Sequence, residues 1–237
     1  MQSHGPREPI QSLLGSLHKK FGTNIGSLTQ QAVELLERIE LNCRAIDGAF
    51  SELIRTHCGD DRQKRECASL VQEIFADFSL AMYLFASGLI VPARMLIRRA
   101  LELGIAVVYM WDLPHEYWGW KQHDEDLSYS KMIEHLASPR YLTHLAVLSG
   151  KEISDQCCDV EIAKKLYRKL SNTVHGKLDG LPPLSPERYS SETNQVEEQL
   201  KLAFDVQRLL IDTWLNRFPT LAPFIKSEFP ATTRNKA

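Results

Sequence analysis

The fold class is decided by residues 27–54, which read SLTQQAVELLERIELNCRAIDGAFSELI. Apolar residues recur there every three or four positions, a spacing that places them on one side of a helix. They are Leu28, Ala32, Leu35, Leu36, Ile39, Ile46, Ala49, Phe50, Leu53 and Ile54. Ser27 and Gln30 have the spacing of a capping box, and Gly59 is expected to end the helix. The stretch therefore predicts one long amphipathic helix.

The same helical spacing of apolar residues, interrupted by helix-breaking residues, continues through the rest of the chain. Further long helices are expected at residues 62–87, 92–111 and 191–218, and shorter ones at 125–137, 139–148 and 159–175. The segments 111–126 and 177–190 contain proline and glycine and are interpreted as connections. No stretch alternates apolar and polar residues as a half-buried strand does. The sequence predicts an all-α protein, an up-and-down helical bundle with extra short helices.

The length of 237 residues is that of one large domain. We expect a flexible N-terminal segment at residues 1–26, a single helical domain at 27–229 and a disordered tail at 230–237.

Composition narrows the class of protein. The net charge of -2 argues against broad, charge-driven binding of nucleic acid, which requires a basic surface. The five cysteines are odd in number and show no C-x-x-C spacing, which fits free thiols in a reducing cytoplasm better than disulfides or zinc. The longest uncharged apolar stretch, residues 78–93, falls short of the ~20 residues that span a bilayer. A cytoplasmic protein without membrane association is expected.

The predicted helix at residues 159–175 contains the candidate functional residues. Its core-facing stripe is expected to hold Ala163, Leu166, Tyr167, Leu170 and Val174. Arg168 and His175 lie two turns apart on the other side, with Ser171 and Asn172 between them and Lys164 nearby. An arginine can grip phosphate oxygens, and histidine titrates near neutral pH, so this face suits a phosphodiester. The alternative is the ordinary polar face of an amphipathic helix, with His175 favoured by the helix dipole.

The run YRKLSNTVHG at residues 167–176 resembles the signature helix of the HEPN superfamily, in which an arginine and a histidine are separated by four to six residues. Six residues separate Arg168 from His175 here. A second run, ARMLIRRALEL at residues 93–103, resembles an earlier helix of a HEPN-like group of bacterial proteins. The resemblance covers roughly residues 69–214.

The resemblance implies a HEPN-like helical domain and a metal-independent endoribonuclease that needs no cofactor, of the kind that acts as a toxin or in phage defence. Such proteins form homodimers in which the Arg and His of two chains face each other. By this likeness His175 is the general acid or base and Arg168 stabilises charge on the phosphorane, while Ser171 and Asn172 orient the phosphate or the imidazole. RNA and a cognate antitoxin or sensor protein are the implied partners.

Two other groups of residues are candidates. Arg98, Arg99 and Glu102 lie in an otherwise apolar helix, so they form an internal salt bridge or supply partners, Arg99 and Glu102 among them, to the Arg168 face. The segment 111–126 mixes tryptophans with histidines and acids but lacks a helical H-x-x-x-H pattern, and its aromatics are expected to fill the end of the bundle.

Two functions stay open at this stage. One is RNA cleavage by Arg168 and His175, and the other is a non-catalytic HEPN-like module that binds a nucleotide, a nucleic acid or a protein partner through the same face.

Overall fold

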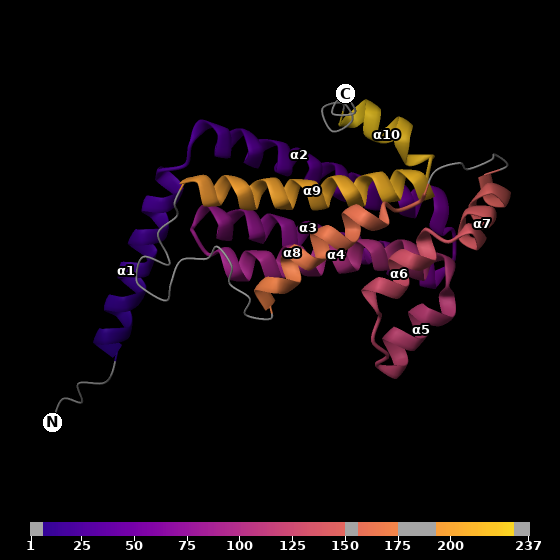
Figure 1. Ribbon diagram of the computed structural model, residues 1–237, viewed down its shortest axis with the longest axis horizontal. Coiled ribbons are helices and arrows are strands. Elements are labelled where there is room, and N and C mark those ends of the chain that lie inside the picture. The colour runs from indigo at the N-terminus through magenta and orange to yellow at the C-terminus, as the bar shows by residue number, and fades with distance from the viewer. Residues whose placement is uncertain (1–6, 150–155, 175–192, 230–237) are drawn as a thin grey trace.

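The computed structural model describes residues 7–149, 156–174 and 193–229 of the chain. These residues form ten α-helices and one π-helical turn, and they contain no β-strand. Four long helices lie side by side as a packed bundle: α2 (Gln30–Leu53), α3 (Arg62–Ala86), α4 (Ile90–Asp112) and α9 (Thr193–Arg217) (Figure 1). The predicted all-α bundle is confirmed. The predicted connection at 177–190 and the tail at 230–237 lie outside the described residues.

Helix α2 begins at Gln30 because the Thr29 side chain accepts a hydrogen bond from the Ala32 amide at 3.1 Å. The prediction that Ser27 caps this helix is wrong, since its hydroxyl donates instead to the Asn24 carbonyl at 2.9 Å. Both residues are good caps, and the position of the preceding turn selects between them. The helix continues into a π-helical turn, η1 (Ile54–Cys58), and stops at Gly59, whose φ of 48° suits glycine.

Helices α3 and α4 form a hairpin with the most extensive packing in the bundle. The Asp61 side chain caps α3 by accepting from the Lys64 amide at 3.2 Å, and Gly88 at φ 84° makes the turn into α4. Of the described helices, α3 alone is long and apolar enough to cross a membrane, judged by length and composition. It packs against α2, α4 and α9, as the core helix of a bundle does.

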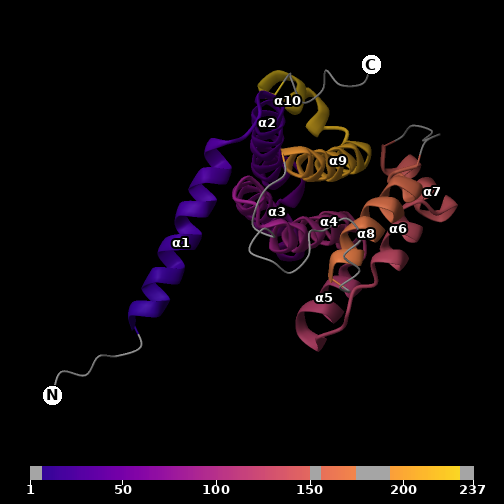
Figure 2. The same ribbon diagram turned by 60° about the vertical axis from the view of Figure 1, so that its left-hand side comes forward.

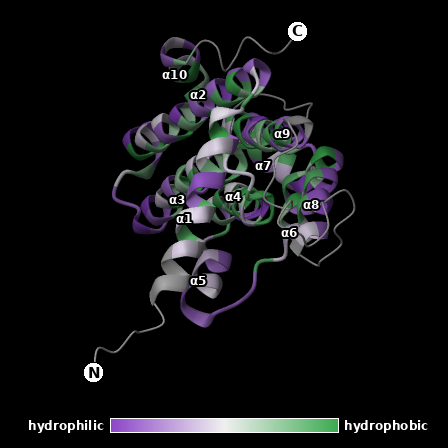
Figure 3. Cartoon of the chain, turned by 90° about the vertical axis from the view of Figure 1, so that its left-hand side faces the viewer, coloured by the Kyte–Doolittle hydropathy of each residue, from purple (hydrophilic) through white to green (hydrophobic). Residues whose placement is uncertain are grey.

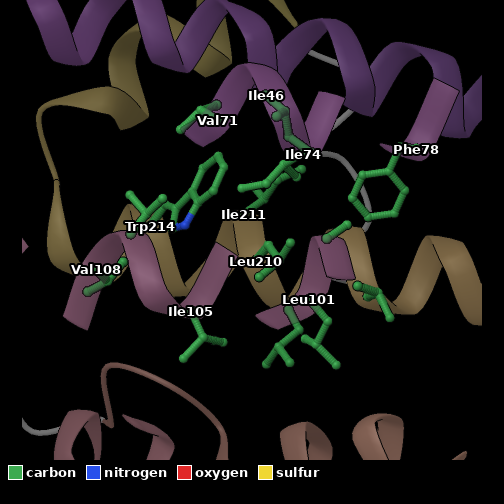
Figure 4. Close-up of a cluster of buried hydrophobic side chains, with 14 of the residues drawn as sticks. Ile46, Val71, Ile74, Phe78, Leu101, Ile105, Val108, Leu210, Ile211 and Trp214 are labelled. Carbon is green, nitrogen blue, oxygen red and sulfur yellow. The ribbon is translucent and has the colours of Figure 1, made fainter. Parts of the chain in front are cut away.

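The core fills the space between these four helices. Figure 4 shows a cluster of buried side chains from all four helices, with Trp214 of α9 on one side of it. They include Ile46, Val71, Ile74, Phe78, Leu101, Ile105, Val108, Leu210 and Ile211. Figure 3 shows the complementary pattern, with hydrophilic residues on the outward sides of α2 and of α8.

Gly104 lets α4 approach α9 closely, and we predict that its replacement by alanine destabilises the protein. A Cβ at this position would lie 2.6 Å from the Cδ1 atom of Leu210, which is itself fully buried. Gly104→Ala improves helix propensity by about 1 kcal/mol, but overpacking of a core costs about 1–3 kcal/mol. We therefore expect a net loss of stability in urea unfolding. Gly22→Ala, where a Cβ meets nothing within 4 Å, is the control and should show no loss.

Shorter helices cover one end of the bundle: α5 (Pro114–His123), α6 (Tyr129–Leu136), α7 (Pro139–Ser149) and α8 (Val160–Val174). Helix α10 (Leu221–Glu228) packs against α2. The interpretation of residues 111–126 as a connection is wrong for α5. Pro114 occupies the first turn, where it is tolerated, and Asp124 ends the helix at φ 57°. Buried Tyr117 stabilises α5 by donating its hydroxyl to Glu66 on α3.

Residues 7–26, expected to be flexible, form helix α1 (Arg7–Gly26). Its last turn is attached to the bundle by Asn24, whose side-chain amide donates to the Ser87 carbonyl at 2.8 Å. The rest of α1 points away from the other helices (Figure 2).

Candidate functional site

Helix α8 packs along α4, and its sequence explains its orientation. The Asp159 side chain caps its first turn by accepting from the Ile162 amide at 2.9 Å. Ala163, Leu166 and Leu170 are buried against the bundle, as the helical spacing predicts. The opposite side of α8 therefore faces outward.

Arg98 of α4 fixes the middle of α8. Its Nη2 donates to the Tyr167 hydroxyl at 2.8 Å, and the guanidinium lies 4.9 Å from the centre of the Tyr167 ring. Its Nε donates to Glu102 at 3.0 Å, which holds the arginine in place. Tyr129 of α6 stacks on Tyr167 with ring centres 4.3 Å apart. Within the described residues, Glu102 thus contacts α8 through Arg98.

Arg94, one turn earlier on α4, fixes the end of α8. Its Nη1 donates to the Thr173 hydroxyl at 2.8 Å and its Nε to the Gln199 side chain of α9 at 2.6 Å. Burial lowers the pKa of this guanidinium, and Glu198 opposes that shift in part. Among the residues that the structure describes, no carboxylate lies within 4 Å of Arg94. A half-buried cation with only neutral hydrogen-bond partners is costly unless an anion joins it.

Arg94 lines a hollow of about 500 Å³ between α8 and α9. The other lining residues are Lys169, Asn172, Glu198, Gln199, Lys201, Leu202 and Asp205. A second hollow of about 690 Å³ shares Lys169 and Asp205 with it and extends along α9 toward Asn216. The two hollows form one groove, which we call the α8–α9 groove.

Charges of both signs line the α8–α9 groove. Burial raises the pKa of the Asp205 carboxyl, while the nearby cations of Lys169, Arg208 and Lys165 oppose that shift. The lysines around Asp205 therefore stabilise the charged form of its carboxylate. An anion bound at these lysines would compete with Asp205 for their charge.

The residues predicted to form the site do not all gather in this groove. Asn172 lines it next to Arg94. Lys164 lies on the outward side of α8, 3.8 Å from Glu134 of α6. Arg168 is exposed and makes no ion pair or hydrogen bond within the described part of the chain. The Ser171 hydroxyl is buried and has no hydrogen-bond partner in that part. His175 lies outside the described residues.

Arg99 points to a different helix. Its guanidinium contacts both carboxylate oxygens of Asp77 at 2.8 and 2.9 Å and Glu73 at 2.9 Å, all on α3. The salt-bridge interpretation holds for Arg98 and Glu102, whereas Arg99 pairs with acids of α3 and not with Glu102. Arg99 is not brought to α8.

The thiols near the site are buried and weakly acidic. All five cysteines are buried, and burial raises the pKa of Cys157 to about 12 and of Cys158 to about 11. Within residues 7–149, 156–174 and 193–229, no three His, Cys, Asp or Glu side chains are grouped to hold a metal ion.

Sequence reasoning missed Arg94 as a site residue, although a signal for it existed. Arg94 lies four residues before Arg98 in the same apolar helix, so the two share a face. Its partners on α8 and α9 are distant in sequence and could not be inferred from spacing.

Comparisons with protein-family models, with curated proteins and with solved structures found no match to this chain.

Proposed function

We propose that this protein is a HEPN-like, metal-independent endoribonuclease that works as a homodimer, with the RNA backbone bound where α8 meets α4 and α9. The observation that carries the proposal is Arg94, a half-buried arginine at the edge of the α8–α9 groove that has no carboxylate partner among the described residues. Such a group is suited to a phosphate.

The groups around Arg94 have the chemistry of a phosphate site. A guanidinium has five N–H donors, and Arg94 uses its Nε and one hydrogen of Nη1 in the contacts with Gln199 and Thr173. Its remaining N–H donors can bind phosphate oxygens in the adjoining hollow without rotation of the guanidinium. Lys169 and Lys201 add positive charge there, and Asn172 adds a neutral donor. Because Gln199 and Thr173 fix the guanidinium beforehand, little side-chain entropy is lost on binding.

The contact between Arg94 and Thr173 lies close in sequence to the residues proposed to cleave the RNA. Thr173, held by Arg94, precedes His175 by two residues in the sequence. In the proposed reaction a ribose 2′-hydroxyl attacks the adjacent phosphorus, and the bond from phosphorus to the 5′-oxygen breaks. His175 takes the proton of the attacking hydroxyl or donates one to the leaving oxygen. Arg168, exposed and unpaired among the described residues, stabilises the charge on the phosphorane.

The test is cleavage of single-stranded RNA in EDTA, with analysis of the product ends. The intact chain should leave cyclic phosphate ends. Arg168→Ala and His175→Ala should each slow cleavage by at least ~10²-fold, the lower end of the contribution of general acid–base catalysis. Arg94→Met should weaken RNA binding. Arg140→Ala, which removes an exposed arginine on α7, is the matched control and should cleave normally. Circular dichroism must show equal helix content in all variants.

A second candidate, a non-catalytic binding module, is favoured by the acids of the groove. Glu198 and Asp205 offset part of the charge of Arg94, Lys169 and Lys201, so the groove fits a short nucleotide as well as a strand. RNA or nucleotide binding that Arg94→Met abolishes, without cleavage by any variant, would establish this module instead. Absence of both cleavage and binding would overturn both functions.

A further inference from the structure

The α9 wall of the α8–α9 groove has charges of alternating sign. The charged residues of α9 that line the groove follow one another at steps of three and four positions, so they lie on one side of the helix. In chain order they are Glu198, Lys201, Asp205, Arg208 and Asp212. Along this wall an acid therefore stands between one cation and the next.

The opposite wall of the groove contributes two further cations. Lys165 and Lys169 of α8 lie one turn apart and both line the groove. Within the described part of the chain, neither these lysines nor Lys201 and Arg208 form an ion pair within 4 Å. Lys169, Arg208 and Lys165 nevertheless oppose the rise that burial causes in the pKa of the Asp205 carboxyl. Asp205 is thus a counter-charge that three cations share.

The two hollows of the groove differ in net charge. The hollow at Arg94 is lined by three cations and two acids, which leaves a net charge of +1. The second hollow is lined by three cations and three acids, which leaves no net charge. Its cations are Lys165, Lys169 and Arg208, and its acids are Asp159, Asp205 and Asp212. The first hollow therefore attracts one phosphate, and a second phosphate gains no net attraction from the second hollow.

The second hollow suits an uncharged group instead. Its volume of about 690 Å³ lies within the range of pockets that hold small organic ligands. Ile162, which is 48% exposed, and Leu166 give it an apolar surface. Asn216 donates from its amide nitrogen to the Gln156 and Cys157 carbonyls at 3.3 and 3.2 Å, which leaves its side-chain oxygen as an acceptor within the described residues. A nucleoside offers both an apolar base face and hydrogen-bond donors to such a surface.

We propose that the α8–α9 groove takes a single phosphodiester at Arg94 with an uncharged nucleoside in the second hollow, and that Asp205 is the specificity-determining residue that keeps a second phosphate out. Asp205 lines both hollows, so it stands where the next phosphate of a strand would enter. Repulsion of a competing ligand gives specificity as well as attraction of the correct one does. The inference rests on the proposed function only in taking Arg94 as the phosphate-binding residue.

The test compares two ligands that differ by one phosphodiester, the thymidine dinucleotide TpT and the trinucleotide TpTpT. Both lack the 2′-hydroxyl, so cleavage by attack of a ribose hydroxyl cannot interfere with the measurement. Dissociation constants are measured by NMR titration of the full-length chain in EDTA. The intact chain should bind the two ligands equally, apart from the statistical gain of TpTpT, which has two diesters that can occupy the site.

Variants of the two acids on the α9 wall give opposite expectations. Asp205→Asn should make TpTpT bind roughly five-fold more tightly than TpT, the size of effect that one screened unit charge has at a protein surface. Glu198→Gln is the matched variant, since it removes an acid from the first hollow alone, and should strengthen the binding of both ligands alike. Asp47→Asn removes an exposed acid of α2, outside the groove, and should change neither. Arg94→Met should abolish the binding of both.

The outcomes separate this inference from the proposed function. Equal binding of TpT and TpTpT by Asp205→Asn, with binding lost in Arg94→Met, would overturn the role of Asp205 and leave the phosphate site in place. Binding of TpTpT by the intact chain that exceeds the statistical gain would show that the groove follows a strand over several phosphates, which would overturn the limit to one. Absence of binding by either ligand would overturn the phosphate site at Arg94 and this inference with it.

Discussion

Arg217→Met is expected to lower the free energy of unfolding by about 3–5 kcal/mol, because it leaves the buried carboxylate of Asp112 without its cation. The two side chains are only 11% and 8% exposed. Two hydrogen bonds of 2.6 and 2.7 Å join the guanidinium to both carboxylate oxygens. The Tyr141 hydroxyl donates to the same carboxylate at 2.7 Å. The ends of α4, α7 and α9 are thus connected through one carboxylate.

Chemical unfolding of matched variants measures this effect. Asp112→Asn/Arg217→Met should recover a large part of the loss, because an amide can still accept from Tyr141 and carries no charge. Arg44→Met removes an exposed pair with Glu40 and should leave stability unchanged within error. Equal effects of Arg217→Met and Arg44→Met would show that the buried pair does not form.

Trp214→Ala is expected to cost about 3–5 kcal/mol, the range found when a large aromatic side chain is removed from a core. The indole is 2% exposed and lies where α4 and α9 meet (Figure 4). Its Nε1 donates to the Gly104 carbonyl at 2.9 Å, so the substitution removes a hydrogen bond together with apolar contact. For a chain of this length, each kcal/mol lowers the melting temperature by roughly 2–4 °C.

Two further tryptophan variants test how much of this loss comes from the hydrogen bond of the indole and how much from its central position in the core. Trp214→Phe keeps most of the apolar volume and loses the indole donor, so it should cost less than Trp214→Ala. Trp118→Ala removes a half-buried tryptophan from α5 and should also cost less. If Trp118→Ala were the more damaging of the two alanine variants, the centre of the core would lie nearer α5 than the packing indicates.

The sequence could not predict every helix, and the failures have physical causes. Helix α5 has aromatic residues on several sides and no apolar stripe, so its sequence lacks the periodicity of an amphipathic helix. Its contacts with α3 and α4 stabilise it, among them those of Tyr117 and Lys121 with Glu66. Helix α1 has the periodicity but is not packed along the bundle, and its first turns lie next to a segment without any pattern. In both cases the decisive contact is with residues distant in the chain.

The candidate site likewise has features that the sequence predicts and features that it does not. Helix α8, its cap at Asp159 and its buried stripe follow from local spacing, since each depends on residues within a few positions. The role of Arg94 does not follow from local spacing, because its partners Thr173 and Gln199 lie 79 and 105 residues away along the chain. The neighbours Arg98 and Arg99 show the limit clearly. They point about 100° apart on one helix, so one contacts α8 and the other α3.

By itself the sequence determined that the chain is helical, where its four long helices lie and which side of each is apolar, because helical periodicity, caps and glycine stops are local properties. Only the tertiary structure decided which arginines are neutralised and which is left with neutral partners beside a groove. That outcome depends on which helices become neighbours, and the burial of apolar surface along whole helices sets those neighbours. The pairing of individual charges then follows from the packing.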